Sequence, residues 1–155
     1  MFVAHSDDDL LWGGRHLIEE KYLVVCMTRG NDPVRSAEFK SVMEATGDKY
    51  LILSYPDKIG KDRSSWNYWK KDMEADIATV LNYKNWKQVA THNADGEYGH
   101  HHHQMTHQLV EEAYKETNWY SRSSRQRDAQ AYQQACSAQG YPHPHTGYPE
   151  AAAPE

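Results

Sequence analysis

The sequence contains no long apolar run and no cluster of basic residues, and each absence excludes a class of protein. A membrane-spanning helix needs about 18 consecutive apolar residues, so no transmembrane segment is expected. Lys and Arg total 17 against 22 Asp and Glu, which gives a net charge of −5. Because binding to a phosphate backbone requires clustered cations, nucleic acid is not an expected partner.

Cysteine is also scarce, with one residue at position 26 and another at position 136. The two have no metal-binding spacing, and Cys26 lies in an apolar run that predicts a buried thiol. This usage fits a reducing compartment, and we expect a cytoplasmic location. No signal peptide is expected, because three consecutive aspartates at 7–9 interrupt the N-terminal segment.

Apolar residues make up 39% of the chain and are concentrated in its first three quarters. We therefore expect one domain over 1–116, because only this part has enough apolar runs to build a core. A C-terminal helix is expected within 117–139. The stretch "YPHPHTGYPEAAAPE" is rich in proline and has no apolar face, so a disordered tail is expected over 140–155.

Within the domain, predicted strands alternate with predicted helices. Short apolar runs predict strands, and apolar residues at helical spacing predict helices. The expected strands are 1–5, 22–28, 50–56 and 86–93, and the expected helices are 10–20, 34–47, 66–83 and 100–116. This alternation predicts an α/β fold, a Rossmann-like three-layer sandwich with a mostly parallel sheet.

The residues with chemical potential directly follow the predicted strands. In chain order the segments are "HSDDD", "TRGND", "YPD" and "HNADGEYGHHHH". Ligands of open α/β sheets bind beyond the carboxyl ends of the strands, so we expect these segments to share one edge. An imidazole beside carboxylates suits a transition metal, and catalytic zinc usually has three protein ligands. Alternatively, the aspartates at 7–9 only stabilise a helix N-terminus.

Four consecutive histidines at 100–103, with a fifth at 107, suggest three interpretations. An expression tag is disfavoured, because the run is internal and flanked by "GEYG". A protease helix of the H-E-x-x-H type is excluded, because Gln104 replaces the glutamate. The third interpretation is a metal ligand near a helix start. His100, His103 and His107 would share one helical face, whereas His101 and His102 would point elsewhere.

Two of these segments resemble the signatures of a known family. "AHSDDD" at 4–9 resembles the A-H-P-D-D-E signature of the PIG-L/LmbE-like family, which are zinc-dependent de-N-acetylases of N-acetylglucosaminyl substrates. "THNADGEYGHHHH" at 91–103 is similar to the second signature, H-N-x-x-G-E-Y-G-H-P-x-H. Residues 28–47 and "SYPD" at 54–57 also resemble its connecting segments. The resemblance covers about 1–116 and implies an LmbE-like fold that is shortened at both ends.

The resemblance implies a zinc hydrolase that removes an N-acetyl group from an N-acetylglucosamine-type substrate by metal-activated water. By this resemblance His5, Asp8 and His103 are the zinc ligands, although another divalent transition metal is open. Asp7 corresponds to the general base. His100 corresponds to the residue that stabilises the oxyanion and protonates the leaving amine.

Three further positions are implied in substrate contact. Tyr98 is expected near the substrate carbonyl, and Arg35 and Asp57 are weaker candidates for holding sugar hydroxyls. Arg35 and Glu38 lie one helical turn apart, so a surface ion pair is an equal alternative for Arg35. The implied partner is a small amino-sugar or glycoconjugate, and the oligomeric state is not predicted.

The chain departs from the signatures at several positions. Ser6 and Asp9 replace proline and glutamate, and His102 stands where the family often has Asp or Gln. These departures leave a second hypothesis open, a truncated or degenerate relative that binds metal or sugar without turnover. A third hypothesis is a related zinc amidase that acts on a thiol conjugate of an amino sugar.

Overall fold

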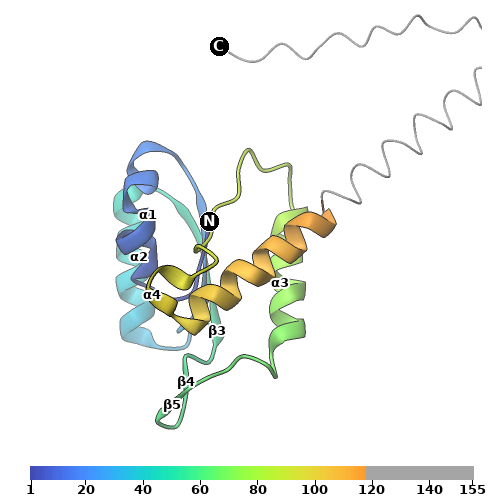
Figure 1. Cartoon of the computed structure of the whole chain (residues 1–155). Helices are drawn as coiled ribbons and strands as arrows, with labels where there is room; N and C mark the ends of the chain where they lie inside the picture. The colour runs from blue at the N-terminus through green and yellow to red at the C-terminus, as the bar shows by residue number, and fades with distance from the viewer. Residues whose placement is uncertain (118–155) are drawn as a thin grey trace, which may run out of the picture. The chain divides into compact units, whose positions relative to one another are not determined.

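A computed structural model describes residues 1–117, which form one compact α/β unit (Figure 1). The elements in chain order are β1 (Phe2–Val3), α1 (Asp8–Glu19), β2 (Leu23–Thr28), α2 (Pro33–Thr46), β3 (Lys49–Tyr55), β4 (Lys58–Ile59), β5 (Asp62–Arg63), α3 (Lys70–Asn82), α4 (Gly96–Gly99) and a helix over 101–117.

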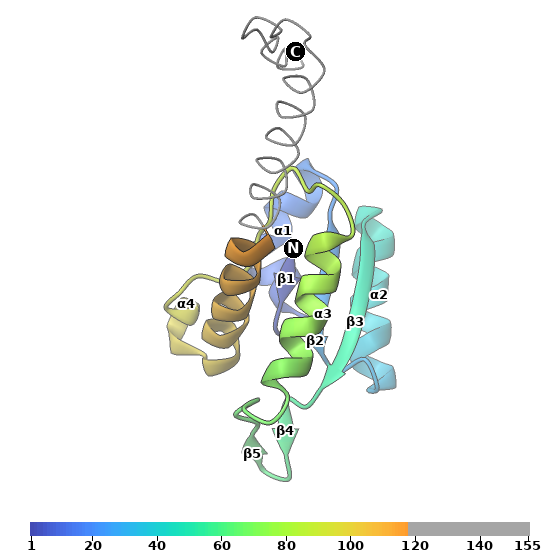
Figure 2. The same cartoon turned by 90° about the vertical axis from the view of Figure 1, so that its right-hand side faces the viewer.

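The central sheet has three parallel strands in the order β1-β2-β3. Val3 of β1 is paired with Cys26 of β2, which is paired in turn with Ile52 of β3. A separate antiparallel pair, β4 and β5, lies beyond the end of β3 (Figure 2). The predicted α/β class with a parallel sheet is therefore confirmed.

Two apolar clusters lie on opposite faces of the sheet, because successive side chains of β2 point to opposite sides. Val24 and Cys26 pack with α1 and α2, whereas Val25 and Met27 pack with α3 and the helix over 101–117. Figure 1 shows these two helical layers with the sheet between them. The fold is thus a three-layer sandwich, and the carboxyl ends of its strands meet at one edge.

Helix α2 has clear start and stop signals in its sequence. The side chain of Asp32 accepts hydrogen bonds from the backbone N–H groups of Val34 and Arg35, both at 3.1 Å, and Pro33 follows at the first helical position. Gly47 ends the helix with φ 71°, a left-handed conformation that glycine adopts without strain. The Asp32 cap fixes the end of the loop that follows β2, and Gly47 begins the connection to β3.

Two predicted elements differ from the structure. The strand expected over 86–93 does not form, and only one backbone hydrogen bond, from Phe2 N–H to the carbonyl of Ala90, links this segment to β1. A two-residue β1 offers too short an edge for a full ladder. The helix expected over 66–83 begins at Lys70, because Trp66 has φ 60°, which is incompatible with a right-handed helix.

Apart from Thr117, the helix predicted within 117–139 and the tail predicted over 140–155 lie outside the residues that the structure describes. Within residues 1–117, no helix has both the length and the apolar character that spanning a membrane would require.

Candidate metal centre

Two segments that are distant in the sequence meet at the carboxyl edge of the sheet. His5 follows β1, and Asp8 is the first residue of α1. His103 lies in the first turn of the helix over 101–117. Asp8 and His103 are buried, and His5 is partly exposed. The structure therefore brings together the three residues that the sequence resemblance implies as zinc ligands.

One carboxylate oxygen of Asp8 is the centre of this cluster. Oδ2 of Asp8 lies 3.1 Å from Nδ1 of His5, 3.3 Å from Nε2 of His103 and 3.4 Å from Nε2 of His92. It also accepts a hydrogen bond of 2.8 Å from the backbone N–H of His5. Three imidazoles therefore surround a single carboxylate oxygen within a buried pocket of side chains.

Glu97 orients His103. Oε2 of Glu97 lies 2.7 Å from Nδ1 of His103, and a carboxylate can only accept, so this nitrogen carries the proton. Nε2 of His103 then has its lone pair free, is fully buried and has no hydrogen-bond partner among the described residues. An acceptor nitrogen in this position, held by a carboxylate on its far side, is typical of a metal-ligating histidine.

A strained turn holds Glu97 in position. Its φ of 59° is rare for a residue with a side chain. Its backbone N–H donates to Oδ1 of Asn93 at 3.0 Å, and the backbone N–H of Asn93 donates to Oε1 of Glu97 at 3.1 Å. These reciprocal hydrogen bonds stabilise the turn and point the carboxylate at His103.

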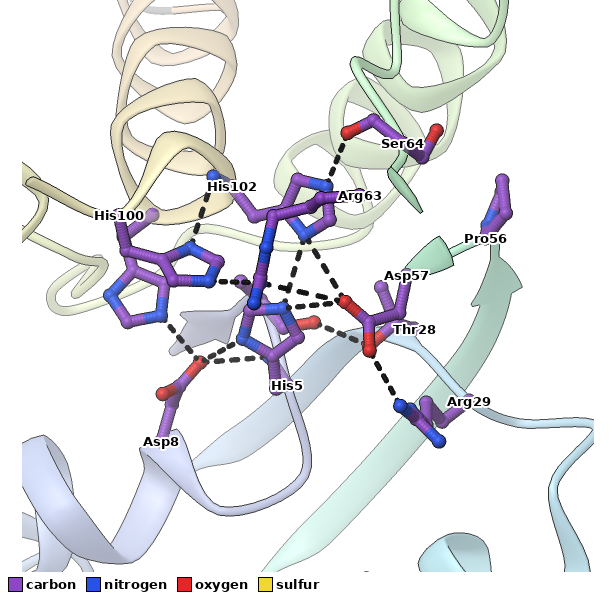
Figure 3. A network of polar contacts seen from close by, with 12 residues as sticks. His5, Asp8, Thr28, Arg29, Pro56, Asp57, Arg63, Ser64, His100 and His102 are labelled. Carbon is purple, nitrogen blue, oxygen red and sulfur yellow. Dashed lines mark hydrogen bonds and ion pairs between the residues drawn. The ribbon is translucent and has the colours of Figure 1, made fainter. Parts of the chain in front are cut away.

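His5 has its proton on the nitrogen that faces away from Asp8. Nε2 of His5 lies 3.1 Å from Nδ1 of His102 and 3.5 Å from Oδ1 of Asp57 (Figure 3). Nδ1 of His102 is an acceptor, because the other nitrogen of that ring lies 2.7 Å from the carbonyl oxygen of Ser64 and must donate to it. Both neighbours of Nε2 of His5 thus accept, and they favour the tautomer with its proton on Nε2. In that tautomer, with a metal ion between Nδ1 and Asp8, the lone pair of Nδ1 is available as a ligand.

The donor set fits a divalent transition metal. Nδ1 of His5, Oδ2 of Asp8 and Nε2 of His103 face one another and can each supply an electron pair to a metal ion. Ligand atoms of these residues lie within 4.8 Å of one another. Two imidazoles and one carboxylate are a ligand set typical of catalytic zinc, with a further position open. The same set accepts other divalent transition metals.

Two other groups of side chains also bring possible ligand atoms close together, but they suit a metal ion less well. In the group of His92, Glu97 and His103, Nε2 of His92 already accepts a buried hydrogen bond of 3.0 Å from the backbone N–H of Ala4 and is therefore not free to bind a metal. The other group combines His5 with His100 and His102, and the positively charged Arg63 guanidinium, which would repel a cation, is in contact with His100.

The electrostatics of the cluster favour a cation between Asp8 and His103. Burial alone raises the pKa of Asp8, but the close polar contacts with the imidazoles of His103, His5 and His92 outweigh it and hold that pKa well below its usual range. Burial lowers the pKa of His103, but the carboxylates of Asp8 and Glu97 outweigh it and raise the pKa. The ionised carboxylate of Asp8 therefore faces Nε2 of His103, and both groups attract a positively charged ion.

His100 lies beside the three candidate ligands. The sequence predicted it on the helix, but the structure does not place it there. Its φ of −73° and ψ of 119° are extended, and the helix begins one residue later. Its ring centroid is 4.8 Å from that of His5 and 4.4 Å from that of His103. Burial, followed by neighbouring imidazoles and Arg63, lowers the pKa of His100 to about 4. The ring is therefore neutral at pH 7.

The remaining predicted residues lie around this centre. The Asp7 side chain is 57% exposed and lies 3.3 Å from the Arg35 guanidinium, which also pairs with Glu38 at 2.7 Å. Tyr98 is 70% exposed, and its ring centroid is 5.6 Å from that of His103. Asp57 faces Nε2 of His5 with one oxygen and pairs with Arg29 at 2.6 Å with the other.

The sequence interpretation missed several residues of the site. His102 was expected to point elsewhere, yet it is fully buried and in contact with His5, because the helix starts too late for a helical projection from His100 to apply. His92 and Glu97 also contact the candidate ligands. From the sequence, Glu97 is either a turn residue or a hydrogen-bond partner near the metal, and its position between two histidine segments does not specify which side chain it contacts.

Comparison with known proteins identifies the relatives of this chain. Residues 1–114 match the model of the PIG-L family, described as GlcNAc-PI de-N-acetylase. A curated protein of Acanthamoeba polyphaga mimivirus, "Uncharacterized protein L374", is 32% identical over 71% of this chain and 55% of its own length.

Among solved structures, GalB, the 4-carboxy-2-hydroxymuconate hydratase of Pseudomonas putida KT2440, has a TM-score of 0.56 at 20% identity. The match covers 72% of this chain and 54% of the hydratase, and at this identity it shows a common fold alone. This chain therefore spans about half the length of both proteins.

Proposed function

This chain belongs to the PIG-L family, and from that membership together with the metal centre we propose that it is a zinc-dependent hydrolase. The proposed reaction removes the N-acetyl group from an N-acetylglucosamine-type substrate and releases acetate and a free amine. The family description, a de-N-acetylase of GlcNAc-PI, supports the amino-sugar substrate.

The observation that carries the proposal is the convergence of three potential metal ligands on one point. His5 and Asp8 come from one segment and His103 from another that is distant in the sequence, and Nε2 of His103 is buried without a hydrogen-bond partner among the described residues. A buried acceptor of this kind costs roughly 1–3 kcal/mol unless something satisfies it. A metal ion held by the three residues satisfies all of them.

When bound, a divalent metal supplies a Lewis acid that polarises the amide carbonyl and lowers the pKa of a water molecule. Asp7 is the proposed general base, and its exposed carboxylate accepts the proton of the attacking water. The C–N bond then breaks as the amine leaves with a proton. Arg35 lies against Asp7, which supports a role in orienting this carboxylate.

His100 is the proposed donor to the carbonyl oxygen as negative charge develops on it. Nδ1 of His100 lies 3.2 Å from the backbone N–H of His102, which donates to it. The Arg63 guanidinium, which can only donate, contacts Nε2 of the same ring, so His100 can offer an N–H from Nε2 only when Arg63 turns away from it. An anionic oxygen between the two groups would then accept from both, which supports oxyanion stabilisation. Protonation of the leaving amine by His100 would first require the neutral ring to take up a proton.

Tyr98 is the proposed substrate contact. Its exposed ring lies beside both His100 and His103, with centroids 5.7 and 5.6 Å away. Arg35 and Asp57 remain weaker candidates for sugar hydroxyls. Arg35 is already paired with Asp7 and Glu38, and Asp57 with Arg29, so either contact with sugar requires these pairs to rearrange.

A second candidate function is metal or sugar binding without turnover. The observation in its favour is that the chain spans 55% of the curated relative and 54% of the solved structure. About half of each of those longer proteins lies outside the matched part, so turnover by this chain needs a direct test.

The test measures acetate released from a panel of N-acetylglucosaminyl compounds by the zinc-loaded full chain. We expect release by the wild type and a decrease in kcat of about 100-fold or more in Asp7→Asn, the typical contribution of a general base. His101→Ala is the matched control, because His101 is exposed and adjacent to the site residues. Undiminished activity in Asp7→Asn would show that the base is wrongly assigned, and zinc binding without acetate release would favour the second candidate.

A further inference from the structure

We propose that His102 is a positioning residue that fixes the orientation and tautomer of His5, so that Nδ1 of His5 is the atom presented to the metal. The proposal rests on the proposed function, because it assumes that His5 is a ligand. His102 links His5 to the backbone carbonyl of Ser64 in a chain of two hydrogen bonds (Figure 3).

The ring of His102 is buried and has two contacts that fix its orientation. It is fully buried, and it stacks on the indole of Trp66 with ring centroids 3.9 Å apart and planes 1° from parallel. Nε2 lies 2.7 Å from the carbonyl oxygen of Ser64. A carbonyl oxygen can only accept, so Nε2 donates and Nδ1 is left as an acceptor in the neutral ring.

The carbonyl that fixes His102 belongs to a turn with an unusual conformation. Trp66 has φ 60°, and its backbone N–H donates to Oγ of Ser64 at 3.3 Å. The indole N–H of Trp66 donates to the carbonyl of Pro56 at 2.8 Å, and the backbone N–H of Ser64 donates to the carbonyl of Asp57 at 3.0 Å. The turn presents both the Ser64 carbonyl and the Trp66 ring to His102.

His102 passes this constraint to His5. Its Nδ1 acceptor lies 3.1 Å from Nε2 of His5, so it requires the proton of His5 on Nε2. Nδ1 of His5 is then unprotonated and faces Oδ2 of Asp8 at 3.1 Å. Without the acceptor on His102, the proton could move to Nδ1 and donate to Asp8, which would remove the lone pair from the metal site.

The two candidate histidine ligands therefore have different outer partners. Nδ1 of His103 lies nearest the Glu97 carboxylate, whereas Nε2 of His5 lies nearest a neutral imidazole that is itself hydrogen-bonded to a backbone carbonyl. The Asp57 carboxylate is further from Nε2 of His5, at 3.5 Å against 3.1 Å. Outer-shell partners of metal-ligating histidines are usually carboxylates, carbonyls or waters, and their loss typically weakens metal affinity about 10- to 100-fold. His102 connects His5 to a backbone carbonyl, and its own ring is held in place by packing on Trp66.

Three substitutions separate the hydrogen-bonding roles of His102. His102→Asn keeps an acceptor near the position of Nδ1, and His102→Gln keeps a donor near the position of Nε2. His102→Phe keeps the stacking on Trp66 but has neither hydrogen bond. Thermal unfolding of each full-length variant reports whether packing is preserved, and His101→Ala is the control from the same histidine run.

The probe is Co²⁺ alone, read by its affinity and by its visible absorption spectrum. We expect His102→Gln and His102→Phe to bind Co²⁺ about 10- to 100-fold more weakly and with an altered spectrum, whereas His102→Asn stays close to the wild type. Long-range ¹H–¹⁵N correlation of the metal-free protein should show a larger share of the tautomer with its proton on Nε2 of His5 in the wild type than in His102→Gln.

The outcomes distinguish the two proposals. A wild type that binds no Co²⁺ overturns the proposed metal site and with it this inference. A wild type that binds tightly, with His102→Gln and His102→Phe unchanged in affinity and spectrum, overturns only the role of His102. Equal weakening in His102→Asn and His102→Gln would also overturn it, because the acceptor would then have no special effect.

Discussion

Nδ1 of His103 lies 2.7 Å from Oε2 of Glu97, while Nε2 of the same ring lies 3.3 Å from Oδ2 of Asp8. The Glu97 carboxylate therefore fixes the proton of His103 on Nδ1, and the Asp8 carboxylate lies opposite Nε2, the nitrogen without a proton. Glu97 therefore supports the candidate metal centre by orienting His103, although Glu97 is not one of the three proposed ligands.

Glu97→Gln is predicted to weaken zinc affinity by about 10-fold or more, because the amide removes the charge that orients His103 and raises its basicity. Competition with a chromophoric chelator measures the affinity. Asp95→Asn makes the same carboxylate-to-amide change at an exposed residue two positions away, and zinc affinity should not change. Equal affinity of Glu97→Gln and the wild type would show that Glu97 does not support His103.

Gly96→Ala is predicted to weaken zinc binding as well as stability. A Cβ at Gly96 would lie 2.7 Å from Cγ and 3.3 Å from the backbone N of Gln104, next to His103 in the first helical turn. Gly60 is the matched control, because it also has a positive φ, 65° against 68°, but its Cβ would meet nothing within 4 Å. Each substitution should cost about 1–2 kcal/mol through left-handed strain. Only Gly96→Ala should lower zinc affinity, and an equal loss in both variants would contradict the steric argument.

Asp48→Ala is predicted to destabilise the fold by about 1–3 kcal/mol, the usual penalty for a buried donor left without its acceptor. Oδ1 of Asp48 accepts a 2.7 Å hydrogen bond from the backbone N–H of Tyr22, where the chain enters β2. Asp48→Asn keeps this acceptor, so urea unfolding should give it a much smaller loss. A similar loss in both variants would assign the effect to the charge of Asp48 instead.

Cys26 is predicted to resist alkylation in the native protein. Its side chain is fully buried on β2, and burial raises the pKa of the thiol to about 12, so the reactive thiolate is nearly absent at pH 8. Iodoacetamide should label Cys26 in urea but not in buffer, as read by mass spectrometry of the peptide that contains it. Equal labelling rates in the two conditions would show that β2 is not buried in solution.

The sequence was sufficient to predict the general place of the site. Consecutive parallel strands direct their carboxyl ends to one edge, so the segments beginning at His5 and ending at His103 were expected to meet there. The same argument predicted the α/β class. It did not predict that residues 86–93 would lack a strand, because strand formation there depends on the length of β1, and β1 has only two residues.

Side-chain partners within the site could not be predicted from local spacing. Helical periodicity placed His100 and His103 on one face, but His100 is extended and only His103 is helical. The contact of His102 with Ser64 depends on the left-handed turn at Trp66, and no sequence pattern indicated a positive φ at a tryptophan. These details arise from tertiary packing of segments 38 residues or more apart.

The most direct test of the account is the zinc stoichiometry and affinity of the full chain, measured by isothermal titration for the wild type, His103→Ala and His101→Ala. The account predicts one tightly bound zinc ion in the wild type and in His101→Ala. In His103→Ala, which removes a ligand, that tight binding should be lost. Wild-type affinity in His103→Ala, or no zinc binding by the wild type, would contradict the assignment of the metal centre.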